Sequence, residues 1–203
     1  ALNEPDGAEG GPAADVLDPR VFDRVRMLLP QCDHVLVFCR AGLRELGLPL
    51  PEWRERARLL LRAGASVVVF TLPGEPDGWE EFEGGLILYG LGALAGGNGR
   101  SLAVSLTLRQ NHLFTYEARL LEQSGGELAF SKSEEAKSEL NARNALLFDE
   151  RAYRAEADRR CLAYVESEAF HAAYMPMRDP GRGFIKGLLH AKDDVREQEE
   201  RAL

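Results

Sequence analysis

The sequence predicts an α/β fold, in which a β-α-β unit and a β-hairpin precede a helical carboxyl-terminal extension. Short apolar runs at residues 34–39 and 66–70 flank a segment with helical periodicity at residues 51–64. Apolar residues then alternate with small or polar ones across residues 102–120, which is typical of a half-buried hairpin. From about residue 133 the periodicity is helical to the end of the chain.

The first predicted helix follows a polar lead-in, residues 1–16, which we expect to be flexible because it is rich in Gly and Pro and has no apolar period. Asp18 is a suitable cap for this helix, and Pro19 is a suitable first residue. A buried strand is predicted next, at residues 34–39. The apolar stripe of the helix consists of Val21, Val25, Leu28 and Leu29.

The second predicted helix begins at Pro51 and ends at Gly64, and the strand at residues 66–70 follows it directly. Strands joined through a crossover helix lie parallel in one sheet, so we expect residues 34–39 and 66–70 to pair in parallel. The apolar face of the helix carries Trp53, Ala57, Leu60 and Leu61.

Residues 74–84 are predicted to form a loop, because a Pro-Gly turn opens the segment and acidic residues dominate it. We expect a further short strand at residues 86–89 and a hairpin turn at Gln110–Asn111. The carboxylates, which we expect to form a solvated rim, are Glu75, Asp77, Glu80, Glu81 and Glu83.

Helical periodicity after residue 133 predicts two consecutive helices and a last one from about Gly183 or Leu188 to Arg201. We therefore divide the chain into the lead-in, an α/β domain at residues 17–130 and a helical extension at residues 131–203. The first two helices are marked by Ala136, Leu140 and Leu147, and by Tyr153, Ala157, Cys161, Tyr164 and Val165.

The composition argues against several classes of protein. A net charge of −8 provides no basic stripe for phosphates, so we expect no nucleic-acid partner. No run of eighteen apolar residues occurs, so we expect no membrane-spanning segment. The first residues do not resemble a signal peptide, and no compartment follows from the sequence. The spacing of the three cysteines matches no zinc signature, and we expect no cofactor.

Residues 34–92 contain three motifs, which read HVLVFCRAG, PEWRERARLLLRAGASVVVFTLPG and FEGGLILYGLGAL. They resemble the carboxyl-terminal half of the capsule-synthesis (CapA / poly-γ-glutamate synthesis) domain, a branch of the calcineurin-like metallophosphoesterases. The family's motifs end in His-Trp-Gly, Ala-Gly-Ala, Gly-His-His-Pro-His and Tyr-Ser-Leu-Gly-Asn. The resemblance implies a partial calcineurin-like sandwich layer, made of the β-α-β unit and the hairpin. The matching scaffold residues are Gly42, Pro51, Ala63, Gly64, Ala65, Pro73, Gly84, Tyr89, Leu91 and Gly92.

The residues that bind metal in that family are replaced in this chain. Arg40 stands where the first histidine is expected, and an arginine offers no lone pair to a cation. Three further histidines are replaced by Thr71, Leu72 and Gly74, and the asparagine by Ala93. We therefore expect no metal site and no catalytic residue. The replaced positions and their neighbours form a possible ligand pocket, which comprises Arg40, Gly42, Thr71, Leu72, Pro73, Gly74, Gly92 and Ala93.

The resemblance implies a divergent protein of capsule or poly-γ-glutamate synthesis that acts as a non-catalytic binding or assembly component. A first alternative is a metal-dependent phosphoesterase-type hydrolase, whose missing ligands come from another segment or chain. A second alternative is an anion- or nucleotide-binding module that uses Gly-rich segments such as residues 96–99. A further possible anion site precedes the last predicted helix and comprises Arg178, Arg182 and Lys186.

Because the resemblance covers only half of a family domain, we expect part of the sheet to expose apolar side chains. An apolar patch of that size usually marks an interface. Self-association, a partner protein or the helical extension would then cover it. The residues expected to line this surface are Leu86, Leu88, Leu102, Val104 and Leu106.

Overall fold

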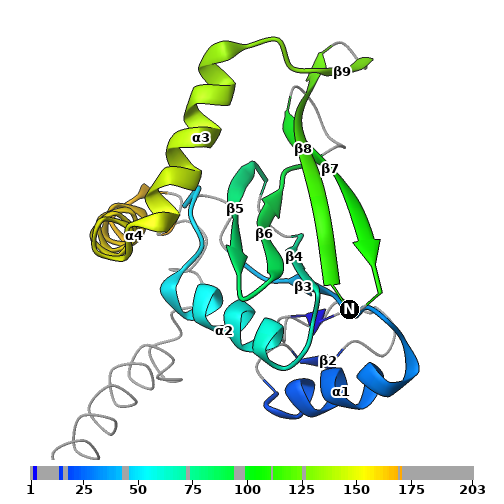
Figure 1. Ribbon diagram of the computed structural model, residues 1–203. Helices are drawn as coiled ribbons and strands as arrows, with labels where there is room; N and C mark the ends of the chain where they lie inside the picture. Colours follow the sequence, from blue (N-terminus) through cyan, green and yellow to red (C-terminus); the bar gives the residue numbers. More distant parts are fainter. Residues whose placement is uncertain are drawn as a thin grey trace, which may run out of the picture. The chain divides into compact units, whose positions relative to one another are not determined.

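A computed structural model describes residues 2–3, 14–15, 18–42, 46–71, 74–93, 99–110, 112–124, 127–168 and 170. These residues form a mixed α/β structure with one six-stranded sheet, one three-stranded sheet and α-helices (Figure 1). The chain divides into two compact units, residues 1–160 and 161–203. Within the described segments, no helix is both long and apolar enough to span a lipid bilayer.

The larger sheet has the strand order β2-β1-β3-β4-β6-β5. Strands β3, β4 and β6 are parallel, with Val37 opposite Val68 and Val68 opposite Ile87. The predicted parallel pairing of the β-α-β unit is therefore confirmed. The lead-in contributes two short strands that composition did not predict. The strands are β1 (Leu2–Asn3), β2 (Ala14–Asp15), β3 (Leu36–Arg40), β4 (Val67–Phe70), β5 (Pro76–Phe82) and β6 (Gly85–Leu91).

The predicted loop at residues 74–84 is wrong, because most of it is strand β5, which pairs antiparallel with β6. Glu83 and Gly84 form the two-residue turn, and both have positive φ values, 48° and 81°. Two positive φ angles are characteristic of the tight turns that join antiparallel strands. The acidic composition of this segment predicts side chains exposed to solvent, yet Asp77 and Glu80 are buried.

The second sheet covers one face of the first. It consists of β7 (Arg100–Arg109), β8 (His112–Ser124) and β9 (Glu127–Phe130), so the predicted hairpin is confirmed and gains a third strand. Leu86, Leu88 and Leu102 are buried within the chain, so they line no exposed surface. The hairpin covers Leu86 and Leu88, whereas Ala136 and Leu140 of the helical extension cover Leu102, which is one of the three kinds of cover expected. The side chains of the hairpin that pack on the core of this face are Val104, Leu106 and Tyr116.

Helices cover the opposite face of the larger sheet. Residues from α1 (Arg20–Leu28) and α2 (Pro51–Arg62) share one core cluster with Val68, Phe70 and Tyr89. A 3-10 helix, Leu29–Gln31, follows α1. The same cluster includes side chains from the helical extension, Leu147 of α3 (Glu134–Phe148) and Tyr153 and Ala157 of α4 (Glu150–Val165).

Helix α3 also contacts the second sheet, because Ala136 and Leu140 form a cluster with Leu102 and Leu120. The structure confirms the two consecutive helices predicted after residue 133, which are α3 and α4. Helix α3 and the part of α4 up to Arg160 belong to the same compact unit as both sheets. The last predicted helix, from about Gly183 or Leu188, lies outside the described residues.

Candidate functional site

The residues that stand at the family's metal-binding positions lie at one edge of the larger sheet. Strands β3, β4 and β6 are parallel, so their carboxyl ends share this edge, where α/β proteins bind ligands. Arg40 ends β3, Thr71 follows β4, and Gly92 and Ala93 follow β6. The Thr71 N–H donates to the carbonyl oxygen of Cys39 at 2.9 Å.

The backbone joins the segments after β4 and β6, because the Ala93 N–H donates to the Gly74 carbonyl oxygen at 3.2 Å. Gly92 has a φ of 73°, and a Cβ there would lie 2.3 Å from the Arg100 carbonyl oxygen, so only glycine fits. Gly42 also has a positive φ, 115°. Leu72 and Pro73 lie outside the described residues.

The described side chains at this edge include few groups that bind metal ions. Arg40 is exposed and offers only hydrogen-bond donors, while Thr71 is exposed and offers one hydroxyl group. In the part of the chain that the structure describes, no group of three or more His, Cys, Asp or Glu side chains is arranged to hold a metal ion. The chemistry available at Arg40 is the binding of an anion.

Asp77 lies just beyond this edge, near the start of β5, and its side chain is buried. Its Oδ1 makes no hydrogen bond among the described residues, and the nearest cationic atom is Nη1 of Arg143 at 3.9 Å. Burial raises the pKa of Asp77 to about 7, although the charges of Arg143 and Arg160 lower it in part. A carboxyl group with this pKa exchanges its proton near neutral pH.

Two arginines of the helical extension donate to backbone carbonyl groups, one at the start of β5 and one in the loop that follows β3. Nη1 of Arg143 donates to the Pro76 carbonyl oxygen at 2.5 Å, and Nη1 of Arg160 donates to the Leu46 carbonyl oxygen at 2.8 Å. A Cβ at Gly47 would lie 3.1 Å from Arg160 Nη1, so the loop passes close to this guanidinium. The extension therefore contacts the start of β5 and the loop after β3 through guanidinium groups.

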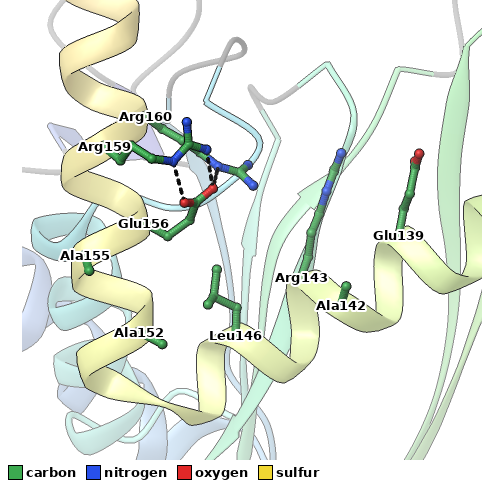
Figure 2. A pocket seen from close by; sticks show the side chains of 9 residues that line it. All are labelled: Glu139, Ala142, Arg143, Leu146, Ala152, Ala155, Glu156, Arg159 and Arg160. Carbon is green, nitrogen blue, oxygen red and sulfur yellow. Dashed lines mark hydrogen bonds and ion pairs between the residues drawn. The ribbon is translucent and has the colours of Figure 1, made fainter.

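Helices α3 and α4 enclose an open cavity of about 640 Å³ (Figure 2). Glu156 accepts hydrogen bonds from Arg159 Nη2 at 2.6 Å and Arg160 Nε at 2.7 Å, and these bonds lower the pKa of Glu156 to about 2. Apolar side chains form the rest of the wall, namely Ala142, Leu146, Ala152 and Ala155.

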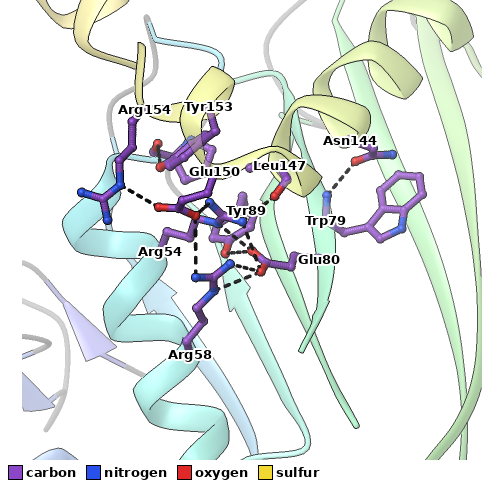
Figure 3. Close-up of polar contacts among 11 residues, drawn as sticks. Arg54, Arg58, Trp79, Glu80, Tyr89, Asn144, Leu147, Glu150, Tyr153 and Arg154 are labelled. Carbon is purple, nitrogen blue, oxygen red and sulfur yellow. Dashed lines mark hydrogen bonds and ion pairs between the residues drawn. The ribbon is translucent and has the colours of Figure 1, made fainter. Parts of the chain in front are cut away.

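A buried polar network attaches the extension to the sheet (Figure 3). Glu80 of β5 accepts hydrogen bonds from Arg54 Nε and the Tyr89 hydroxyl group, both at 2.8 Å, and from Arg58 Nε at 3.0 Å. Burial opposes the ionisation of Glu80, but these hydrogen bonds outweigh it and lower its pKa. Glu80 is therefore ionised inside the core.

Arg54 extends the same network to the corner between α3 and α4. Its Nη1 donates to Glu150 at 2.7 Å, and its Nη2 donates to the Leu147 carbonyl oxygen at 2.5 Å. The guanidinium also lies over the ring of Tyr153, 4.4 Å from its centroid. One buried arginine of α2 thus contacts a strand and both helices of the extension.

Sequence reasoning missed this network, although α2 carries a signal for it. Arg54, Ala57 and Leu61 share one helical face by their spacing, which places an arginine in the apolar stripe. No local sequence pattern indicates the contacts of Arg143 and Arg160, because the residues that they contact lie far away in the sequence. The sequence-predicted anion site at Arg178, Arg182 and Lys186, and most of the Gly-rich segment 96–99, lie outside the described residues.

Comparisons of this chain with protein-family models and with curated proteins find no match. The site is therefore interpreted from its own residues and from the motif resemblance at residues 34–92.

Proposed function

We propose that this chain is a divergent, metal-independent protein of the CapA / poly-γ-glutamate synthesis type, which acts as a binding or assembly component and not as a hydrolase. The proposal includes a partial calcineurin-like sandwich layer, formed by the β-α-β unit and the β7–β8 hairpin. The binding surface in this proposal is the carboxyl edge of the larger sheet, centred on Arg40.

One observation carries the proposal. Arg40, Thr71 and Ala93 lie at the same edge of the larger sheet, although 53 positions of sequence separate Arg40 from Ala93. In the resembling family this arrangement gathers metal ligands, whereas here it gathers an arginine, a hydroxyl group and a methyl group. Two-metal hydrolysis requires imidazole, carboxylate or amide ligands around each cation. An arrangement that matches the family's motif spacing but lacks its ligands favours binding over hydrolysis.

Titration of the full chain with poly-γ-glutamate tests the binding role. We expect saturable binding that Arg40→Gln weakens about tenfold, because a charge-assisted hydrogen bond is lost. Arg24→Gln is the matched control, since it removes the same charge from an exposed position of α1 and should leave the affinity unchanged. Absence of binding, or an equal loss in both variants, would contradict the proposed surface.

A phosphodiesterase assay with bis(4-nitrophenyl) phosphate tests the rival hydrolase. We expect no turnover above the rate of the metal ion alone when Mn²⁺ or Zn²⁺ is added. Metal-dependent turnover that persists in Arg40→Ala would show that ligands lie elsewhere, and it would support the hydrolase instead.

A further inference from the structure

The cavity between α3 and α4 has features that the family resemblance does not explain. It lies entirely within the first compact unit, between residues 139 and 160. Three guanidinium groups line it, Arg143 from α3 and Arg159 and Arg160 from α4 (Figure 2). Cavities that bind small molecules combine an apolar wall with a few fixed polar groups, and this one does so.

Two of the guanidinium groups are held in place before any ligand arrives. Arg143 donates to the Pro76 carbonyl oxygen, and Arg160 donates to the Leu46 carbonyl oxygen. Their side chains are only 25% and 28% exposed, so their long stems are ordered by packing. Ordering a side chain in advance lowers the entropic cost of binding.

These arginines retain donors that can face a ligand. Among the described residues, no hydrogen bond engages Nε or Nη2 of Arg143, or Nη2 of Arg160. Glu156 engages Arg159 and Arg160 from the same helix, but it does not reach Arg143 on the opposite wall. The positive charge of Arg143 is therefore only partly balanced within the cavity.

The second carboxylate of the cavity, Glu139, is already paired. It accepts a hydrogen bond from Arg100 of β7 at 2.6 Å. Asp77 approaches Arg143 no closer than 3.9 Å, which is beyond hydrogen-bond distance. The cavity thus presents more guanidinium donors than carboxylate acceptors.

The remaining wall is apolar and has small side chains. Leu146 and three alanines, Ala142, Ala152 and Ala155, leave the space open between the helices. An inorganic anion would leave this wall in contact with water, whereas an organic anion would cover it. The wall therefore selects for a ligand that carries an apolar part.

We propose that this cavity binds a small organic anion, whose carboxylate or phosphate group accepts hydrogen bonds from Arg143 and Arg160 while a short apolar part contacts Leu146 and the alanines. A guanidinium fork matches the two oxygens of either group. This site is separate from the carboxyl-edge surface around Arg40, so its failure in a test would leave the proposed function standing.

Isothermal titration of the full chain with phenyl phosphate, benzoate, inorganic phosphate and acetate tests the site. We expect phenyl phosphate or benzoate to bind at one site, with a dissociation constant of about 1 mM or tighter. Inorganic phosphate and acetate should bind more weakly, because neither contacts the apolar wall. The tighter of the two aromatic anions identifies the preferred acidic group.

Variants separate this site from general surface charge. Arg143→Gln should weaken binding about tenfold, and Arg159→Gln should weaken it less, because Arg159 lines the cavity but already donates to Glu156. Arg159 has an exposed side chain, so its replacement leaves the core intact. Ala155→Trp should abolish binding by filling the cavity without changing any charge. Arg151→Gln is the control, because it removes an exposed arginine of α4 that does not line the cavity.

Three results would overturn the proposal. The first is the absence of binding by all four anions to a folded protein. The second is an equal loss of affinity in Arg151→Gln and Arg143→Gln, which would indicate attraction by net charge alone. The third is unchanged affinity in Ala155→Trp, which would place the anion outside the cavity.

Discussion

Asp77 is a buried carboxyl group that lies near two arginines, Arg143 and Arg160, and one exposed carboxylate, Glu75. In the unfolded chain it ionises near its ordinary pKa of 3.8, whereas burial raises the pKa in the folded protein to about 7. The folded state therefore keeps a proton that the unfolded state has released. Between these two pKa values, the contribution of Asp77 to the free energy of unfolding therefore falls as the pH rises.

Asp77→Asn should remove this pH dependence. Between about pH 5 and pH 8, we expect the free energy of unfolding of wild type to fall by up to about 3 kcal/mol more than that of the variant. The reason is that most of this pH range lies between the two pKa values of Asp77. Urea unfolding across the range measures it, with Asp158→Asn on the exposed surface of α4 as the control. Parallel stability curves for wild type and Asp77→Asn would show that the carboxyl group is solvated.

At the scale of elements, α2 and β5 are connected by a buried ion pair. The side chains of Arg54 and Glu80 are 4% and 7% exposed, and their atoms lie 2.8 Å apart. Removing one partner of such a pair leaves an uncompensated charge inside the core, which costs far more than the loss of a surface pair. The pair also places β5 against the helices of the extension.

Glu80→Gln should therefore destabilise the protein by about 3–5 kcal/mol in chemical unfolding. Glu134→Gln is a suitable comparison, because Glu134 pairs with Lys137 on the exposed face of α3, and it should cost less than about 1 kcal/mol. The double variant Arg54→Met, Glu80→Gln should recover part of the loss. Equal effects of Glu80→Gln and Glu134→Gln would mean that Glu80 is not buried with a charge.

The sequence predicted those elements whose signal is local. Val67–Phe70 is a continuous apolar run, and the alternation across β7 and β8 is regular, so both were assigned correctly. Strand β5 was missed because its burial depends on partners distant in sequence, as when Asn144 accepts a hydrogen bond from the Trp79 N–H at 2.9 Å. The spacing of the motifs was sufficient to predict that Arg40, Thr71 and Ala93 lie close together at the carboxyl edge. The Arg143 and Arg160 contacts required coordinates.

At the scale of the whole molecule, the first helices of the extension belong to the core of the α/β unit. Tyr153 is fully buried, and its hydroxyl group donates to the Pro49 carbonyl oxygen at 2.7 Å. We expect Tyr153→Ala to cost about 3–5 kcal/mol, because it leaves a large cavity and an unpaired carbonyl group. Leu162→Ala, at a side chain that is 65% exposed, should change stability little. Equal melting temperatures for the two variants would contradict this packing.

Self-association stays a prediction, but its expected surface changes. The hairpin and α3 cover Leu86, Leu88 and Leu102, whereas Leu36 and Phe38 of β3 remain 38% and 47% exposed. Apolar groups on a strand surface favour contact with a second surface. If copies of the chain associate there, light scattering should show a mass that rises with concentration and that Phe38→Ser lowers. A mass that is independent of concentration would contradict this.

We expect the carboxyl edge of the larger sheet, with Arg40, Thr71 and Ala93, to bind no metal ion. The most direct measurement is the melting temperature of the full chain with and without Mn²⁺ or Zn²⁺, since a ligand that binds the folded state raises it. We predict no change with either ion. A rise of several degrees with either ion would contradict this prediction, and a rise that Arg40→Ala leaves intact would show that the ligands lie elsewhere in the fold.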